Sequence, residues 1–535
     1  QILIHLRMGS VASVCFPSET SAAKVNAEET KRAEQQKLTE TKDDEGTFDR
    51  KSLVDSLTKK LKDADQMELL TYEAELSDDE LKILGNDINS IDFKQVDKLY
   101  KKCMKSEGKD EDTINPFPSE NIIDVSELKD TESNELIELG YKAISNGECA
   151  IIILAGGQGS RLGFDKPKGA YIIDGLLSKK SIFEIHLNKL KKVSNIANTK
   201  NNGNAGDIPL YIMTSKATHG DTLQYLKDYN YFGYNGNNVK LFQQKYFPCM
   251  YNNGKIILKS KYEISFNPNG NGGIYPALKD EGILIDMKKR GVKYIQIFGV
   301  DNILAKMGDP LWFGNIIKMK ADASNKTTRK TEPSEAIGVM CLRNNKPSVL
   351  EYSEITTEMS ELKDDTDNNL LYSCGNLAMH AFSFEFLDKF VNGDDNILDK
   401  LPIHVAKKKI AYYDSKLAKT VPKGDLTENN GIKLEYFIFD SFSFANKMTA
   451  VNIKRSNEFA PVKNKSGKDS PATALTLYSN FCKQLLIKNG AILEDNSDDK
   501  ICEISPLTSY DGEGLDKYNG KTIQLPILID DKSKL

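Results

Sequence analysis

A buried strand that runs directly into a glycine-rich turn constrains this chain more than any other feature of its sequence. Residues 149–154 form a continuous apolar run, and residues 154–169 read LAGGQGSRLGFDKPKG. Glycines let backbone amides approach phosphate oxygens closely, and ligands of open parallel sheets bind beyond the carboxyl ends of the strands. Arg161 and Lys168 add two cations to the same segment. This combination predicts a site for a polyanion such as a nucleoside triphosphate.

Two other phosphate-binding loops are excluded by the spacing of this segment. The dinucleotide fingerprint G-x-G-x-x-G requires glycine at the position of Leu162. The Walker loop requires Gly-Lys-Ser/Thr, whereas the lysine here lies in Pro167-Lys168-Gly169. A glycine-rich turn with two surface cations is the structural alternative, and the density of Gly, Arg and Lys after a strand disfavours it.

Apolar runs and amphipathic helical patterns alternate through the middle of the chain. After residues 149–154, strands are predicted at 208–213, 239–242, 294–300 and 337–342, with helices at 181–193 and 282–290. Such alternation indicates crossover units. We therefore expect the α/β class, with a central Rossmann-like, mainly parallel sheet flanked by helices, a helical N-terminal region and a small C-terminal domain.

Changes in composition suggest four regions. Residues 1–50 are polar and predict a flexible arm. Residues 51–132 predict a helical N-terminal region, in which Leu53, Leu57 and Leu61 recur every fourth position. Residues 133–446 are expected to form the catalytic domain, starting with a helix that Ser133 caps. Residues 447–535 are expected to form the small C-terminal domain, with a strand at 448–454 and a helix at 473–489.

Composition excludes several classes of function. The 72 Lys and Arg residues nearly balance the 77 Asp and Glu residues, which argues against nucleic acid as a partner. The longest apolar runs are too short to span a bilayer, so no membrane function is expected. None of the eight cysteines has Cys-x-x-Cys spacing, which disfavours a zinc ribbon and indicates a reducing compartment. No cleavage pattern follows the short apolar N-terminal stretch, and we expect a cytoplasmic protein.

The glycine-rich segment, read as L-x-x-G-x-G-S-R-L-G-x-x-x-P-K-G, resembles the eukaryotic-type UDP-sugar pyrophosphorylases. The resemblance covers about residues 133–475 and includes six further segments in order. They are Phe242-Gln243-Gln244, Asn269-Gly270-Asn271-Gly272-Gly273, Val300-Asp301-Asn302, Glu351-Tyr352-Ser353-Glu354, Gly375-Asn376, and Pro461-Val462-Lys463-Asn464 with Gly467-Lys468-Asp469. Ser160 stands where threonine is commoner in the family. Two segments depart further from the family pattern, Lys245-Tyr246-Phe247 and Pro276, and both are expected beside the active site.

The resemblance implies a uridylyltransferase that makes UDP-N-acetylglucosamine and pyrophosphate from UTP and N-acetylglucosamine 1-phosphate. One alternative is a UTP–glucose-1-phosphate or broad-specificity UDP-sugar pyrophosphorylase. A second alternative is a catalytically silent nucleotide-sugar-binding regulator. The silent alternative is disfavoured because Arg161, Lys168, Asp301 and Lys463 are all present. The sequence does not indicate an oligomeric state.

Residues for the two substrates follow from the same resemblance. Gln244 follows the predicted strand 239–242, and its amide carries the donor and acceptor groups that match the edge of uracil. The positions that match UTP-binding residues are Ala155, Gly156, Gly157, Gln244 and Gly270. The positions that match sugar-binding residues are Asn271, Gly338, Glu351 and Asn376.

Catalysis is expected to rest on cations and a metal ion. The resemblance implies that Arg161, Lys168 and Lys463 are catalytic. Asp301 follows the predicted strand 294–300, so it should emerge at the same sheet edge as the glycine-rich segment and bind Mg²⁺, with Mn²⁺ as a substitute. Asp440 lies among aromatic residues, where a carboxylate is costly without a cation. We predict a second metal-side role for Asp440, and the alternative is a buried partner for a helix or a lysine.

No general base is expected, because the attacking phosphate oxygen is already anionic at neutral pH. The five histidines are isolated in the sequence, and His186 and His404 are interpreted as ordinary positions on helical segments.

Overall fold

The computed structural model describes residues 48–105, 112–203, 205–365, 368–393 and 397–530. The predicted flexible arm, residues 1–50, lies outside this range except for its last three residues. The contacts divide the chain after Asn86 into two units. No helix in the described ranges is both long and apolar enough to cross a membrane.

The first unit is helical where it is described. It contains α2 (Arg50–Asp63), two short 3₁₀ helices, η1 (Met67–Leu70) and η2 (Glu73–Glu75), and most of α3 (Asp78–Ser90). The predicted leucine repeat lies on α2, where Leu57 and Leu61 are buried. The carboxylate of Asp49 accepts a hydrogen bond from the Ser52 backbone and so caps the start of this helix.

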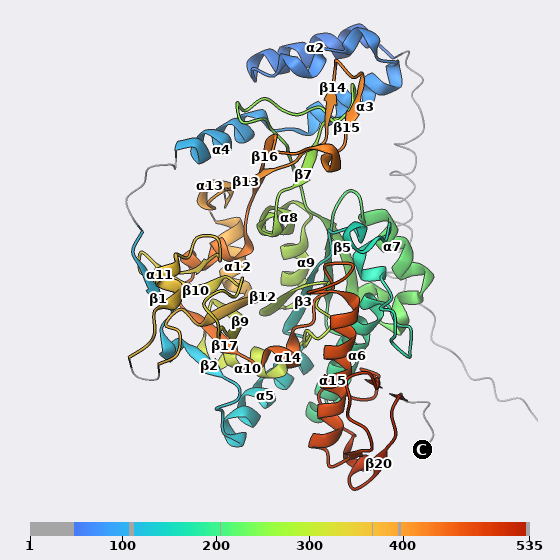
Figure 1. Cartoon of the computed structure of the whole chain (residues 1–535), viewed down its shortest axis with the longest axis vertical. Helices are drawn as coiled ribbons and strands as arrows, with labels where there is room; N and C mark the ends of the chain where they lie inside the picture. Colours follow the sequence, from blue (N-terminus) through green and yellow to red (C-terminus); the bar gives the residue numbers. More distant parts are fainter. Residues whose placement is uncertain (1–47, 106–111, 204, 366–367, 394–396, 531–535) are drawn as a thin grey trace, which may run out of the picture. The chain divides into compact units, whose positions relative to one another are not determined.

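Within the described residues of the second unit, eleven strands form one sheet (Figure 1). Its main order is β2 (Ile122–Asp124), β17 (Met448–Asn452), β9 (Ala323–Arg329), β12 (Cys374–Ser383), β8 (Tyr294–Gly299), β3 (Cys149–Leu154), β4 (Leu210–Thr214) and β5 (Val239–Gln243). Neighbours in this order are parallel except where β12 lies between β9 and β8. Strands β1 (Ile114–Pro116), β10 (Val339–Arg343) and β11 (Lys346–Leu350) extend the sheet.

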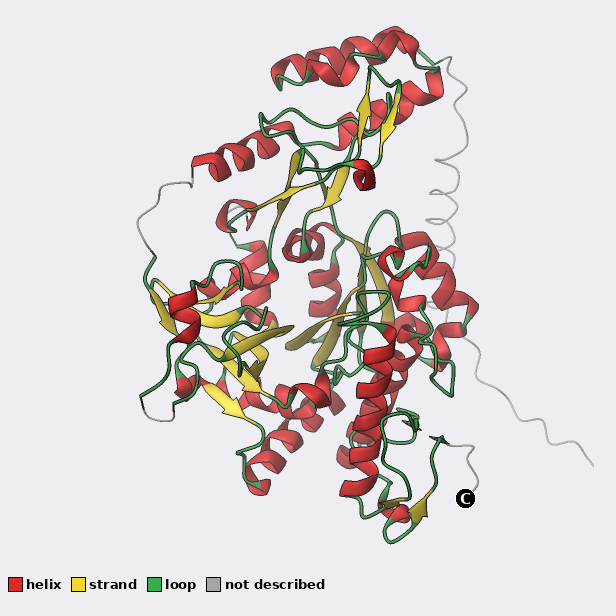
Figure 2. Cartoon of the chain, in the orientation of Figure 1, coloured by secondary structure: helices red, strands yellow, loops and turns green. Residues whose placement is uncertain are grey.

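Helices flank this sheet, as Figure 2 shows, and the predicted α/β class is confirmed. The α-helices described in the second unit, not all of which contact the sheet, are α4 (Phe93–Lys105), α5 (Asp130–Ser145), α6 (Ile182–Asn201), α7 (His219–Asp228), α8 (Ile274–Asp280), α9 (Ile283–Arg290), α10 (Pro310–Met319), α11 (Thr357–Glu361), α12 (Phe384–Asn392), α13 (Ile397–Lys400), α14 (Arg455–Glu458) and α15 (Pro471–Lys488). Small two-stranded sheets pair β6 (Tyr246–Pro248) with β7 (Phe266–Pro268), β13 (His404–Lys408) with β16 (Gly431–Glu435), β14 (Tyr412–Asp414) with β15 (Lys419–Val421), β18 (Ile492–Leu493) with β20 (Thr522–Ile523), and β19 (Cys502–Ile504) with β21 (Ile527–Ile529).

The predicted strands at 149–154, 208–213, 239–242 and 294–300 are confirmed as β3, β4, β5 and β8. The run at 337–342 is strand β10, but it forms an antiparallel hairpin with β11 and not a crossover unit. The predicted cap at Ser133 was wrong, because α5 begins at Asp130. Its start is stabilised one turn earlier, where the Glu132 carboxylate accepts a hydrogen bond from the Lys129 backbone.

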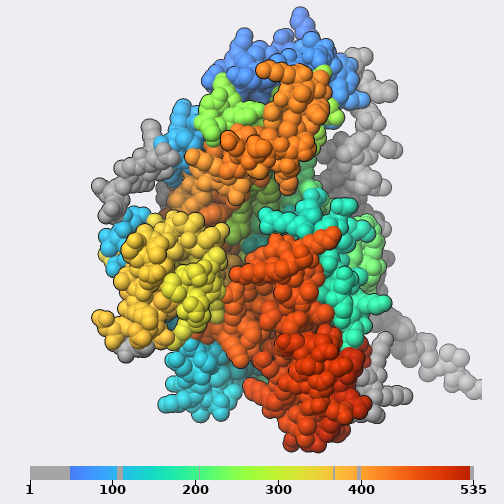
Figure 3. Space-filling view, viewed as in Figure 1, coloured from blue at the N-terminus to red at the C-terminus, as the bar shows by residue number. Residues whose placement is uncertain are grey.

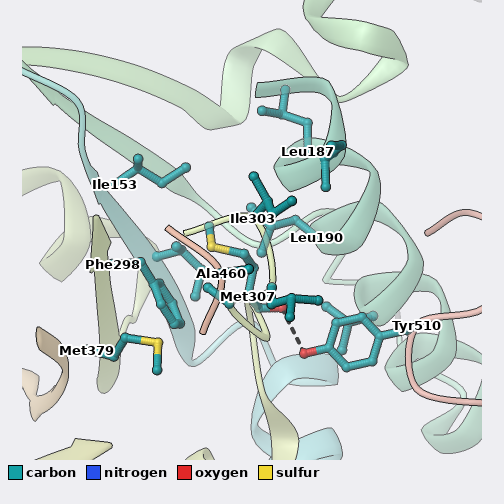
Figure 4. Close-up of a cluster of buried hydrophobic side chains, with 14 of the residues drawn as sticks. Ile153, Leu187, Leu190, Phe298, Ile303, Met307, Met379, Ala460 and Tyr510 are labelled. Carbon is teal, nitrogen blue, oxygen red and sulfur yellow. Dashed lines mark hydrogen bonds between the residues drawn. The ribbon is translucent and has the colours of Figure 1, made fainter. Parts of the chain in front are cut away.

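The core joins the central strands to α5, α6, α10 and α15. Figure 4 shows Ile153 and Phe298, from β3 and β8, on one side of this cluster and Leu187 and Leu190 of α6 on the other. The Tyr510 hydroxyl donates a hydrogen bond of 3.1 Å to the carbonyl oxygen of Met307. The C-terminal segment is therefore tied to the loop that follows β8.

The predicted C-terminal domain, residues 447–535, contributes a strand to the central sheet. Strand β17 lies between β9 and β2, and it is parallel to both. Residues 448–451 are buried there. Pairing between strands so far apart in sequence leaves no local signal, so composition alone did not reveal this insertion. The domain boundaries inferred from the sequence stay predictions.

Candidate active site

The glycine-rich segment folds back on itself directly after β3. The Lys168 backbone donates to the carbonyl oxygen of Gly157 (3.3 Å), and the Gly159 backbone donates to that of Lys166 (3.0 Å). Gly163 ends the short helical turn η4 (Ser160–Leu162) with a φ of +72°, a left-handed conformation that favours glycine. Arg161 is exposed and Lys168 is half-buried, so both predicted cations lie at the surface of this loop.

The predicted uracil-reading residue lies against the glycine-rich segment. Gln244 follows β5, is buried, and donates from its backbone to the Thr214 carbonyl at the end of β4. A Cβ atom on Gly156 would lie only 2.4 Å from Nε2 of Gln244. The Ala155 backbone donates to Met213 O on β4. The ends of three neighbouring parallel strands thus bring together Ala155, Gly156 and Gln244.

Asp301 emerges at the same edge, from the neighbouring strand. The Val300 backbone donates to Leu154 O at 3.1 Å, which sets the end of β8 beside the glycine-rich segment. The Val462 backbone donates to the carbonyl oxygen of Asp301 at 3.0 Å. Lys463 follows immediately, and its ammonium lies 5.6 Å from the Phe459 ring centroid. The predicted carboxylate and the predicted C-terminal lysine are therefore on contacting segments.

Asn302 strengthens the joint between these two segments. Its side-chain oxygen accepts from the backbones of Ala460 (2.8 Å) and Leu304 (3.3 Å), and its amide donates to the carbonyl oxygen of Glu458 (2.7 Å). In the space-filling view, the orange-red segment that carries Lys463 and the yellow segment of β10–β12 adjoin on one face (Figure 3). Asn302 therefore ties the loop after β8 to the segment that leads to Lys463.

Two polar side chains of helix α6 contact backbone carbonyl oxygens on either side of Asp301. Nε2 of His186 lies 2.9 Å from Val300 O, and the Lys189 ammonium donates to the carbonyl oxygens of Ile303 (2.6 Å) and Ala305 (3.0 Å). Burial lowers the pKa of His186 to about 3 and that of Lys189 to about 7. His186 is on a helix, as predicted, but sequence reasoning missed these three hydrogen bonds. A histidine and a lysine three positions apart on an otherwise apolar helix face were the available signal.

Three of the four predicted sugar-binding residues lie together. The Asn376 backbone, on β12, donates to Gly338 O at 2.8 Å. A Cβ atom on Gly338 would lie 3.1 Å from the carboxylate of Glu351. Burial, together with the charge of Glu354, raises the pKa of Glu351. The cluster thus offers a carboxylate and an amide next to a position without a side chain.

Gly270 and Asn271 pack against the segment that leads to Asp440. Gly270 has a φ of +85°, and a Cβ atom there would lie 2.3 Å from the carbonyl oxygen of Tyr436. The side-chain oxygen of Asn271 accepts a hydrogen bond from the Ile438 backbone at 3.0 Å. Glycine at 270 is therefore required by both the backbone conformation and the close approach.

Asp440 pairs with a histidine. Nε2 of His404 lies 3.0 and 3.1 Å from the two carboxylate oxygens, one of which also accepts from the Phe437 backbone. The interpretation of His404 as helical was wrong, because it starts strand β13 and its ring stacks on that of Phe437. Burial raises the pKa of Asp440, although the His404 bond opposes this shift. Asp440 and Glu351 line the same cavity, of about 440 Å³.

The donor set fits a metal ion that binds together with a triphosphate. Asp301 is a half-buried carboxylate at the sheet edge. Mg²⁺ is usually held by one or two carboxylates plus substrate phosphates. Among the described residues, no group of three or more His, Cys, Asp or Glu side chains could hold a metal ion. The predicted metal roles of Asp301 and Asp440 stay predictions.

The two segments that depart from the family pattern are anchored in the fold. The Lys245 ammonium forms an ion pair with Asp280 of α8 at 2.5 Å. Pro276 is buried in the same helix, next to Tyr275, whose hydroxyl donates to Ile438 O at 2.5 Å. An ion pair and a hydrogen bond thus tie α8 to the segment after β5 and to the segment that leads to Asp440.

Comparisons with known proteins found a matching family model, similar sequences and similar structures. A family model described as UTP–glucose-1-phosphate uridylyltransferase matches residues 92–508. A Dictyostelium discoideum protein is 40% identical over 465 residues, 85% of this chain and 93% of that protein. The UDP-N-acetylglucosamine pyrophosphorylase of Saccharomyces cerevisiae is 37% identical over 465 residues, 85% of this chain and 92% of the yeast protein. The crystal structure of the uridine diphosphate N-acetylglucosamine pyrophosphorylase from Trypanosoma brucei in complex with inhibitor matches with a TM-score of 0.76 and 29% identity, covering 92% of this chain and 100% of that chain.

Proposed function

Because this chain belongs to the UTP–glucose-1-phosphate uridylyltransferase family, we propose that it transfers a uridylyl group from UTP to a sugar 1-phosphate. The sugar we propose is N-acetylglucosamine, so the products are UDP-N-acetylglucosamine and pyrophosphate. The contact between Gly156 and Gln244 carries the proposal, since it sets a side-chain amide that can read uracil beside a loop suited to phosphates.

The chemistry follows from charge and position. The attacking phosphate oxygen of the sugar substrate is already anionic, so no side chain needs to remove a proton. The protein has to hold two anions in line and neutralise charge near the α-phosphorus. Arg161 and Lys168 are on the loop where the departing pyrophosphate would lie, and Lys463 is beside Asp301, where it would hold the incoming phosphate. Mg²⁺ or Mn²⁺ on Asp301, with Asp440 as a second metal-side residue, would neutralise charge on triphosphate oxygens.

Two observations favour the acetylated sugar. Asn376, Gly338 and Glu351 form one cluster that offers an amide and a carboxylate. The relative from Saccharomyces cerevisiae is named for UDP-N-acetylglucosamine. The family description names glucose 1-phosphate, so that substrate is the alternative. We place the reaction in the cytoplasm, because the cysteines of the described ranges are free thiols, as a reducing compartment favours.

Pyrophosphate release from UTP with a panel of sugar 1-phosphates tests the proposal. The purified full chain should be fastest with N-acetylglucosamine 1-phosphate. A preference for glucose 1-phosphate would support the alternative sugar and leave uridylyl transfer standing. Release with none of the sugars, in the presence of Mg²⁺, would contradict the proposed activity and favour a silent nucleotide-sugar-binding protein.

A further inference from the structure

Two buried polar residues lie behind the predicted sugar-binding amide. The side-chain oxygen of Asn376 accepts hydrogen bonds from the Ala378 backbone (2.8 Å) and from Nδ2 of Asn325 on β9 (3.0 Å). The side-chain oxygen of Asn325 in turn lies 2.8 Å from Nδ1 of His380. Asn325 and His380 are both buried. A series of hydrogen bonds therefore runs from His380 on β12, through Asn325 on β9, and back to the side-chain amide of Asn376 on β12.

A bulge in β12 allows the hydrogen bond from the Ala378 backbone to the side-chain oxygen of Asn376. The register between β12 and β9 shifts between Asn376 and Met379. Ala378, at the bulge, has a φ of +54°, which is unusual for a residue with a side chain. This conformation turns the Ala378 N–H onto the side chain of Asn376. The strained backbone of Ala378 thus orients the side-chain amide of Asn376.

The directions of these hydrogen bonds determine which side-chain atoms of Asn376, Asn325 and His380 carry hydrogens. A backbone N–H only donates, so the Asn376 atom that faces Ala378 is its oxygen. The Asn325 atom that bonds this oxygen must then be its nitrogen, which leaves the Asn325 oxygen to face His380. Nδ1 of His380 therefore carries a hydrogen. Burial lowers the pKa of His380 to about 3, so the ring is neutral and Nε2 is unprotonated.

This orientation leaves the NH₂ group of Asn376 for a ligand. Its oxygen already accepts two hydrogen bonds, and its Nδ2 makes none with the described residues. The Asn376 backbone is bonded to Gly338 O, and the Glu351 carboxylate lies beside Gly338. The cluster therefore presents a hydrogen-bond donor next to an acceptor. A carbonyl oxygen on the ligand fits the donor, and a hydroxyl fits the carboxylate.

We propose that Asn325 and His380 are positioning residues for sugar selectivity, which hold Asn376 as a donor to the acetamido carbonyl oxygen of the sugar. The inference rests on the proposed function, because that function supplies the acetylated sugar. With the amide reversed, Asn376 would present an oxygen to the acetamido oxygen. A buried polar mismatch of this kind costs more affinity than a lost methyl contact.

The variant Asn325→Asp tests this directly, because it keeps the shape and replaces the donor to Asn376 with an acceptor. Binding of UDP-N-acetylglucosamine and of UDP would be measured by calorimetry on the full chain. We expect the dissociation constant for UDP-N-acetylglucosamine to rise about tenfold or more, with that for UDP changed by less than about twofold. The matched control is Asn315→Asp, an equally buried asparagine whose side-chain oxygen accepts from Thr449. The control should leave the ratio of the two constants unchanged.

Two further variants, both at His380, distinguish a selective effect on the sugar from a general folding defect. His380→Phe keeps the ring contact with Phe442 but removes the donor to Asn325, so it should weaken UDP-N-acetylglucosamine selectively. His380→Gln restores a donor and should recover most of the affinity. Equal weakening of UDP and UDP-N-acetylglucosamine, or wild-type binding in both Asn325→Asp and His380→Phe, would overturn the proposal. Wild-type protein that binds these ligands but releases no pyrophosphate would contradict the proposed activity, and the binding comparison would still decide the role of Asn325 and His380.

Discussion

The ammonium nitrogen of Lys189 lies 2.6 Å from the carbonyl oxygen of Ile303, two residues beyond Asp301. The same group also donates to the carbonyl oxygen of Ala305, at 3.0 Å. Burial lowers the pKa of Lys189 to about 7, so keeping a lysine here has an energetic cost. The two hydrogen bonds that Lys189 donates hold the loop that carries Asp301 in position.

We predict that Lys189→Met lowers kcat by about tenfold, because small displacements of catalytic groups have large effects on rate. Stability should change less, because loss of two hydrogen bonds is offset by removal of a buried charge. Lys191→Met is the matched control, since Lys191 also donates to a carbonyl oxygen, that of Gly233, but at the surface of the same helix. Steady-state kinetics and thermal unfolding of both variants would separate the two effects. Equal kcat values for Lys189→Met and wild type would rule out a positioning role.

Removal of a cation from the glycine-rich loop should slow the reaction strongly. We expect Lys168→Ala to lower kcat/KM by about 10² or more, as is typical for a donor aimed at developing charge. Arg161→Ala should behave similarly, and Arg161→Lys should restore activity only in part, because a point charge replaces a planar fork of donors. Near wild-type kcat/KM in Lys168→Ala would remove that residue from the site.

Activity should require a divalent metal. We expect a chelator to abolish pyrophosphate release and Mg²⁺ or Mn²⁺ to restore it, since both favour oxygen ligands. Asp301→Asn should lose most turnover while keeping the wild-type thermal midpoint, because its backbone contact to Val462 does not involve the carboxylate. Full activity of Asp301→Asn at limiting Mg²⁺ would show that another group binds the metal.

Two buried histidines predict a loss of stability in acid. Burial lowers the pKa of His186 and of His380 to about 3, below the value of about 6.5 in an unfolded chain. Between these values the unfolded state binds more protons, so stability is full above about pH 6.5 and falls as the pH drops toward 3. Each histidine should cost about 2 kcal/mol at pH 5.

Fluorescence of the single, fully buried Trp312 would report unfolding in denaturant at several pH values. His186→Gln keeps a side chain that can donate to Val300 O and removes one titrating group. Its unfolding free energy should therefore depend on pH less steeply than that of wild type. Identical pH dependence of the two proteins would mean that His186 has the same pKa in the folded and unfolded states.

The sequence predicted the strands and the glycine-rich segment because their signals are local. Apolar runs mark β3 and β8, and glycine density marks the loop between β3 and α6. The supporting contacts were missed because they join distant residues: Lys189 and Ile303 are 114 positions apart, and His404 and Asp440 are 36 apart. Their side chains meet only after the sheet has formed, so no spacing along the chain encodes them.

The fit between Gly156 and Gln244 gives a test of the nucleotide site. A Cβ atom on Gly156 would lie 2.4 Å from the Gln244 amide nitrogen, so Gly156→Ala must displace that amide. We expect KM for UTP to rise about tenfold, with KM for the sugar 1-phosphate changed by less than about twofold, because a buried amide that reads a base loses its partner. Gly220→Ala on α7 is the control, since a Cβ atom there meets no atom of the described structure within 4 Å and Gly220 is not among the predicted UTP-binding residues. Both variants should unfold near the wild-type temperature. Discrimination between UTP and CTP should fall in Gly156→Ala and persist in Gly220→Ala, because only the first substitution moves Gln244. Unchanged discrimination in Gly156→Ala would mean that Gln244 does not read the base.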